Sequence, residues 1–168
     1  IRDSLRSRAM SLSQYAIYLR RAGLRRREIP YIWKLIDRRN SMETRVEEAA
    51  KKKQCGFNCA QAVACTYCDL AGIDEETMKN LNQGFAVGIG VSMEATCGAI
   101  IGAVNVLGAI NKNPQKTMKS ARNIITSFKE QNGTVICKEL KGIADGVVKR
   151  ECIDCVRDAA RLLENELG

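Results

Sequence analysis

Eight cysteines and no histidine define the chemistry open to this 168-residue chain. Cys59, Cys65 and Cys68 fall within ten residues of one another, and Cys152 and Cys155 form a C-x-x-C pair. Without imidazole, the sequence excludes mixed cysteine–histidine zinc sites, Rieske clusters, histidine-ligated haem and a cysteine–histidine catalytic pair. Any bound metal is therefore held mainly by thiolates, which leaves an iron–sulfur cluster, zinc, or a thiol site without metal.

The large number of cysteines also indicates in which cellular compartment the protein is expected. Cysteines in such number form disulfides in secreted proteins and serve metal or redox chemistry in the cytosol. The sequence shows no secretory signal, and the best candidate for a membrane span, "CGAIIGAVNVLGAI", has only 14 residues, fewer than the roughly 18 that a span requires. We therefore expect a cytoplasmic protein with reduced thiols and no membrane span.

The positive charge of the chain is confined to its first quarter. Residues 1–41 contain eleven basic and three acidic residues, whereas the rest of the chain holds sixteen of each sign. This asymmetry predicts two parts, a basic helical N-terminal arm over residues 1–41 and a cysteine-rich helical redox domain over residues 42–168.

The arm has two interpretations. The segment "YLRRAGLRRREIPYIWKLIDRR" consists of a helix, a glycine turn and a second helix beginning near Pro30, which is the outline of a helix-turn-helix. In one interpretation the arm binds DNA, with an affinity that falls steeply as salt rises, and the chain is a redox-sensing regulator. In the other it packs on the core or on the second subunit of a homodimer.

For the remainder, few aromatic residues and many small aliphatic ones favour a single all-α domain, a bundle of five to six helices. Near the centre we expect the helix at about 94–110, because Gly98, Ala99, Gly102 and Ala103 allow a neighbouring helix to approach closely. A glycine loop, "GFAVGIG", precedes it, and a short element, "TVICKELKG", follows later. The other helices are predicted over about 42–54, 58–71, 74–83, 117–132 and 152–167.

These elements determine where the sulfurs lie. With about 100° per residue along a helix, Cys59 faces the core, while Cys65 and Cys68 face elsewhere. Cys97 is expected in the first turn of the central helix and Cys152 at the start of the last one, where the helix dipole stabilises a thiolate. The small residues after Cys97 are expected to leave room for a bulky group beside the sulfur.

Four cysteine segments occur in a fixed order: "GFNCAQAV", "TCGAIIGAVNVLG", "ICKELKG" and "CIDCVRDA". Over about residues 46–167 they resemble the C_GCAxxG_C_C family of redox-active proteins. The resemblance implies a helical fold and a redox site made of Cys59, Cys97, Cys137 and Cys152. The same segments are similar also to the cluster-bearing part of split-Soret cytochromes. This second resemblance implies that the four cysteines hold an iron–sulfur cluster for electron transfer or redox sensing.

Two alternatives to the cluster stay open. After the cluster, the second possibility is metal-free thiol–disulfide exchange, because the thiolates are suited to it. An all-thiolate zinc site is the third, since the four cysteines are separated by 38, 40 and 15 residues, unlike the compact knuckles of structural zinc sites. The sequence leaves open whether the chain is an oxidoreductase or a carrier, which redox partner protein it serves, and whether Cys55, Cys65, Cys68 and Cys155 form a second site.

Overall fold

The computed structural model describes residues 44–143 and 145–168, so the predicted arm and the boundary predicted at residue 42 lie outside it. Regular structure in the described part is helical, apart from one isolated β-bridge between Thr96 and Ile136. The all-α prediction is therefore confirmed. The helices are α3 (Val46–Gln54), α4 (Cys59–Thr66), α5 (Cys68–Ala71), α6 (Glu75–Leu81), α7 (Gly98–Asn111), α8 (Pro114–Asn132), α9 (Cys137–Leu140) and α10 (Cys152–Leu167), with a 3₁₀ turn, η1 (Gln83–Phe85).

Eight α-helices in the described part exceed the five to six expected, because short helices add to the long ones. The segment predicted as one helix over 58–71 is divided at Tyr67, whose backbone (φ −116°, ψ 16°) ends α4 and begins α5. Tyr67 is fully buried and its hydroxyl donates to Glu164 of α10. The helix is therefore interrupted where the Tyr67 side chain packs into the core, and the helical pattern of the sequence does not predict this interruption.

Local signals in the sequence account for most helix ends. Asn58 and Gln61 form a capping box at the start of α4, with Gln61 N–H donating to Asn58 Oδ1 at 2.8 Å. Asp74 caps α6 in the same position, and Asn113 caps α8 before Pro114. Gly133 ends α8 in the left-handed conformation, as the sequence predicts.

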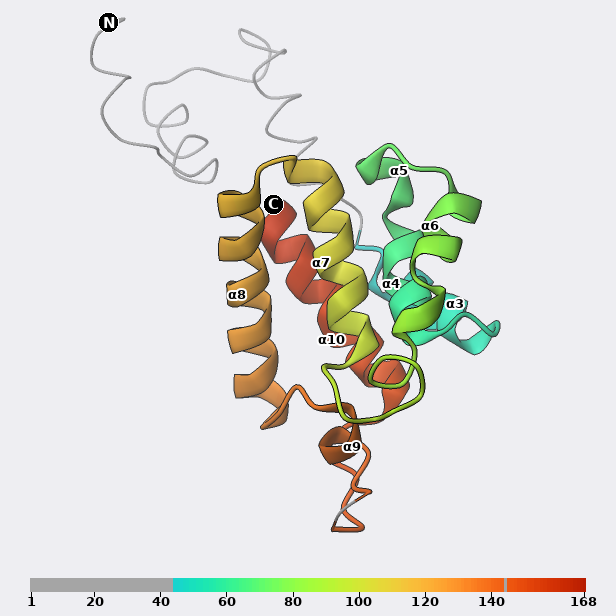
Figure 1. Cartoon of the computed structure of the whole chain (residues 1–168), viewed down its shortest axis with the longest axis vertical. Helices are drawn as coiled ribbons and strands as arrows, with labels where there is room; N and C mark the ends of the chain where they lie inside the picture. Colours follow the sequence, from blue (N-terminus) through green and yellow to red (C-terminus); the bar gives the residue numbers. More distant parts are fainter. Residues whose placement is uncertain (1–43, 144) are drawn as a thin grey trace, which may run out of the picture. The chain divides into compact units, whose positions relative to one another are not determined.

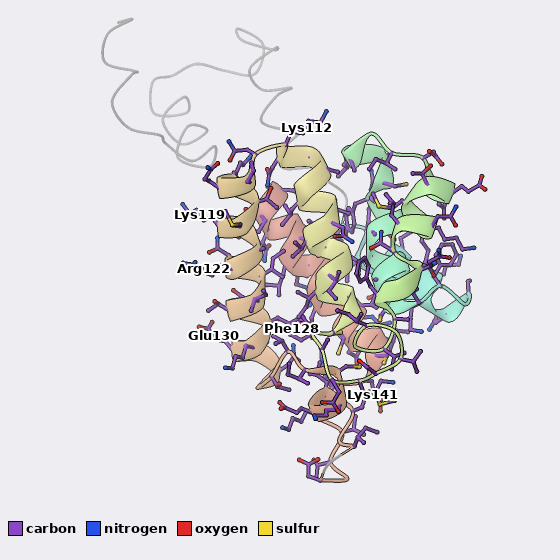
Figure 2. The ribbon with its side chains drawn as sticks, viewed as in Figure 1. Lys112, Lys119, Arg122, Phe128, Glu130 and Lys141 are labelled. Carbon is purple, nitrogen blue, oxygen red and sulfur yellow. The ribbon has the colours of Figure 1, made fainter. Side chains whose placement is uncertain are left out.

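Helix α7 occupies the centre of the described bundle. Figure 1 shows α7 between α8 on one side and α4 with α6 on the other, with α10 packed behind it. In Figure 2 Phe128 of α8 lies on the side that faces the bundle, where it is fully buried, whereas Lys119 and Arg122 lie outward. At Gly102 the backbones of α7 and α4 approach so closely that a Cβ would lie 3.1 Å from both Cα and C of Ala60.

One end of the bundle gathers the N-termini of α7 and α10 together with α9 (Figure 1). The return of the chain from α9 to α10 is fixed by the N–H groups of Lys149 and Arg150, which both donate to the Leu140 carbonyl at 3.0 and 3.1 Å. Arg150 also makes a two-bond ion pair with buried Asp158, at 2.8 and 3.0 Å. Cys152 therefore enters α10 beside α9.

Helix α7 begins at Gly98, four residues later than the predicted start at 94. The reason is the β-bridge at Thr96, because the Cys97 N–H donates to Val135 O at 2.8 Å and not to a carbonyl one helical turn earlier. Cys97 is thus the residue that caps α7, not part of its first turn. Among the helices of residues 44–143 and 145–168, none combines the length and apolar character that crossing a membrane demands.

Candidate functional site

Cys97 and Cys137 are brought together by the backbone. The Cys97 N–H donates to Val135 O, and the Cys137 N–H donates to Ala95 O at 3.0 Å, on either side of the Thr96–Ile136 bridge. These two hydrogen bonds hold Cys97, the residue that caps α7, beside Cys137, the first residue of α9.

Cys59 reaches the same region from α4, of which it is the first residue. Its sulfur lies against the start of α7, because a Cβ built on Gly98 would stand 2.6 Å from it and would overlap the Phe85 carbonyl oxygen. The predicted room after Cys97 is therefore not empty. At Gly98 the missing side chain instead allows Cys59 and Phe85 to contact the helix backbone.

Cys152 completes the set from the start of α10. It is half-buried, unlike Cys59, Cys97 and Cys137, which are 5 to 7% exposed. Burial lowers the pKa of Lys141, but the neighbouring Cys152, Cys137 and Cys59 together raise it above its usual value. The structure thus brings the four cysteines singled out by the sequence to one end of the bundle, from α4, α7, α9 and α10.

A fifth cysteine, Cys155, belongs to this group although the sequence interpretation left it outside. It is buried one turn after Cys152 in α10, where its thiol donates to the Arg150 carbonyl oxygen at 3.9 Å and lowers the pKa of Cys97. The C-x-x-C spacing was the available signal, because residues three apart on a helix lie on the same side.

The thiols of the site differ in acidity. The pKa of Cys97 is lowered, chiefly by the neighbouring Cys155, which together with the N–H groups of Ala99 and Ile100 outweighs the effect of burial. The Cys97 sulfur makes no conventional cap hydrogen bond, so these N–H groups act as oriented dipoles at the helix start. Burial raises the pKa of Cys137 to about 11, and the neighbouring Cys97 followed by burial raises that of Cys155.

The glycine loop covers the site in an unusual conformation. Five consecutive residues, 87–91, have positive φ between 49° and 66°, and three of them are β-branched. Left-handed backbone costs about 1–2 kcal/mol for a residue with a Cβ. In this conformation Gly88 passes so close to the Cys137 side chain that an added Cβ would lie 2.9 Å from the Cys137 Cβ. Burial raises the pKa of Cys59, and the nearby backbone of Val87 opposes this effect.

The remaining cysteines lie apart from this group. Burial raises the pKa of Cys65 to about 11, and its thiol points at the Glu75 carbonyl oxygen, 3.8 Å away. Burial, followed by the charges of Asp69 and Glu75, raises the pKa of Cys68, and no site sulfur contributes to this shift. Cys55 is exposed. All three therefore differ in surroundings from the five thiols at the end of the bundle.

The donor atoms are those that an iron–sulfur cluster uses, since the site offers several cysteine sulfurs from separate elements. Two glycines, Gly88 and Gly98, let the loop and the helix start approach those sulfurs where a Cβ would intrude. In the part of the chain that the structure describes, no three or more histidine, cysteine or acidic side chains are grouped as they would be around a metal ion.

Comparison with known proteins gives one match. The family model described as "Putative redox-active protein (C_GCAxxG_C_C)" matches residues 57–166, which include all five thiols of the site. No curated protein and no solved structure shows a significant match to the chain.

Proposed function

Because the chain belongs to the C_GCAxxG_C_C family of redox-active proteins, we propose that it transfers or senses electrons through an iron–sulfur cluster held by Cys59, Cys97, Cys137 and Cys152. The observation that supports this proposal is that Cys59, Cys97, Cys137 and Cys152 stand at the starts of α4, α7, α9 and α10. The Cys59 sulfur lies against Gly98, next to Cys97, and Cys97 and Cys137 flank the Thr96–Ile136 bridge.

When bound, the cluster supplies the one-electron chemistry, and the chain supplies its surroundings. Cys59, Cys97 and Cys137 are buried, so water is excluded from three of the four sulfurs. Cys97 caps α7, so the N–H groups at the start of this helix face the region of its sulfur. Burial and backbone dipoles beside the sulfurs are among the means by which a protein sets a cluster's reduction potential. The eight free cysteines fit a reducing compartment such as the cytoplasm.

The test is to purify the full chain without oxygen and to measure iron and acid-labile sulfide per chain. We expect both in the wild type, with visible absorption that bleaches on reduction. Replacing any one of the four proposed ligands by serine should lower the iron content by about tenfold or more, since even outer partners of a metal site are worth that much.

The matched controls are Cys65→Ser and Cys68→Ser, which remove a thiol of the same chain away from the site and should keep the iron content of the wild type. A wild-type protein without iron and sulfide would contradict the cluster. A control that loses iron as fully as Cys59→Ser would show that the four ligands are wrongly chosen.

A second function, thiol–disulfide exchange without metal, is supported by the two buried thiols of Cys97 and Cys155, since the pKa of Cys97 is lowered and that of Cys155 is raised. A small disulfide such as oxidised glutathione is the oxidant. The Cys97 thiolate attacks one of its sulfurs and releases the first half as a thiol. Cys155 then attacks the Cys97 sulfur, loses its proton, and releases the second half, so two protein thiols are oxidised and one disulfide is reduced.

This exchange predicts a specific cross-link. Cluster-free protein treated with oxidised glutathione should yield a peptide linking Cys97 to Cys155, and Cys155→Ser should stop at a mixed disulfide on Cys97. Since the pKa of Cys97 is lowered and that of Cys68 is raised, Cys97 should react at lower pH than Cys68. Peptide mapping by mass spectrometry reads out both, and a link through Cys68 instead would refute the exchange.

A further inference from the structure

Left-handed residues that carry a side chain are concentrated in the loop that precedes α7. In the part of the chain that the structure describes, five residues other than glycine have positive φ, and Val87, Ile89, Val91 and Met93 are four of them. This conformation is unfavourable for residues with a Cβ, and most of all for β-branched ones. The side chains cannot compensate fully by packing, since Ile89 and Val91 are 45% and 65% exposed. The loop therefore has a shape that its own residues disfavour.

Backbone hydrogen bonds hold the loop in this shape. Within it, the Gly90 N–H donates to Gly84 O and the Met93 N–H donates to Val87 O, both at 2.9 Å. Its end is tied to α9, because the Lys138 N–H donates to Met93 O at 2.9 Å. Strained backbone persists only where its surroundings enforce it. These bonds therefore work against the strain, and the balance between the two decides how often the loop changes shape.

The strained loop lies against the side chain of Cys137. Gly88 is buried, and a Cβ on it would stand 2.9 Å from the Cys137 Cβ. In Figure 1 the loop lies at the end of the bundle where α7 and α10 begin. Cys137 is only 5% exposed. A change in the shape of the loop removes the Gly88 backbone from this thiol and uncovers it.

We propose that residues 84–93 form a lid over the redox site, which is closed in the left-handed shape and opens to admit a small reactant to Cys137. The strain makes opening easier, because Val87, Ile89 and Val91 lose it when they relax to extended backbone. The opening follows from the backbone alone. Only its use in redox chemistry rests on the function proposed above.

The test measures opening as the rate at which iodoacetamide alkylates buried thiols in reduced, cluster-free, full-length protein. Peptide mapping by mass spectrometry gives the rate at each cysteine. Cys65 is the matched thiol, since it is 3% exposed and burial raises its pKa to about 11, as it does for Cys137. The Cys65 thiol points at the Glu75 carbonyl oxygen and not at the lid. Local opening requires less free energy than opening of the core, so Cys137 should react faster than Cys65.

Gly90→Ala should raise the alkylation rate of Cys137 by about fivefold and leave that of Cys65 unchanged. Gly90 has a φ of +60°, and a Cβ on it would meet nothing within 4 Å, so the change adds left-handed strain without a clash. Gly84→Ala is the matched control, because a Cβ there also meets nothing and φ is not positive. It should leave both rates unchanged.

Ile89→Asn changes the strain in the opposite direction. Asparagine adopts left-handed backbone more readily than isoleucine, so the closed lid is favoured and the alkylation rate of Cys137 should fall by about threefold. This variant decides the question even if Gly90→Ala does not fold, since an unchanged Cys137 rate would refute the lid.

Two results with Gly90→Ala also overturn the inference. One is a Cys137 rate equal to that of Gly84→Ala. The other is a rise at Cys65 as large as the rise at Cys137, which would mean that the core opens and not the lid. A wild type that carries no iron and sulfide overturns the proposed cluster instead, and the alkylation rates still decide whether the lid exists.

Discussion

Replacing Gly102 by alanine should lower the free energy of unfolding by about 2 kcal/mol, because it inserts a methyl group where two helix backbones touch. A Cβ at this position would overlap the Ala60 carbonyl oxygen and lie 3.1 Å from two further backbone atoms of Ala60. Backbone atoms cannot rotate aside as a side chain can, and all eight residues of α4 are buried. Overpacking of this kind costs about 1–3 kcal/mol or more, against a gain of at most about 1 kcal/mol in helix propensity.

Gly108→Ala is the matched control, since it makes the same change on the same helix. Its added Cβ meets one atom, Thr117 Cγ2, at an ordinary 3.9 Å. Here the helix propensity of alanine should dominate and stabilise the protein by up to about 1 kcal/mol. Urea unfolding of both cluster-free variants at one pH measures the two changes. Equal shifts for Gly102→Ala and Gly108→Ala would mean that α4 and α7 do not meet at Gly102.

The helices were largely predictable because their ends depend on nearby residues. Asp74 and Asn113 accept hydrogen bonds from the first turns of α6 and α8, and Gly133 ends α8, as short-range capping rules require. The two errors arise from contacts between distant segments. Tyr67, which bonds to Glu164 97 residues away, lies at the break between α4 and α5, and the bridge between Thr96 and Ile136 delays the start of α7.

The candidate site, too, could be predicted only in part from the sequence. The four family cysteines could be named from their sequence segments, and the small residues of α7 correctly indicated a close helix contact at Gly102. The surroundings of Cys155 could not be predicted, because they depend on α9, α10 and the cap of α7 meeting at one end of the bundle (Figure 1). The run of left-handed residues over 87–91 was equally hidden, since three of the five are β-branched residues that disfavour it.

Helix packing and the geometry of the site depend on each other most directly at Gly98, because the glycine hydrogen faces the Cys59 sulfur. A Cβ on Gly98 would lie 2.6 Å from the Cys59 sulfur and would overlap the Phe85 carbonyl oxygen. Gly98→Ala must therefore push away both a proposed ligand and the 3₁₀ turn that leads into the covering loop. The expected result is a loss of iron and sulfide by about tenfold in anaerobically purified protein, similar to the loss of an outer partner of a metal site.

The comparison with Gly102→Ala and Gly108→Ala separates this geometric effect from instability. Gly102→Ala strains the same helix against α4 through backbone atoms of Ala60 and meets no sulfur, while Gly108→Ala causes no strain. If the site depends on the position of Cys59, only Gly98→Ala should lose iron per folded chain, with the folded fraction measured by far-ultraviolet circular dichroism. Equal losses in Gly98→Ala and Gly102→Ala would trace the iron content to stability alone and would remove Gly98 from the site.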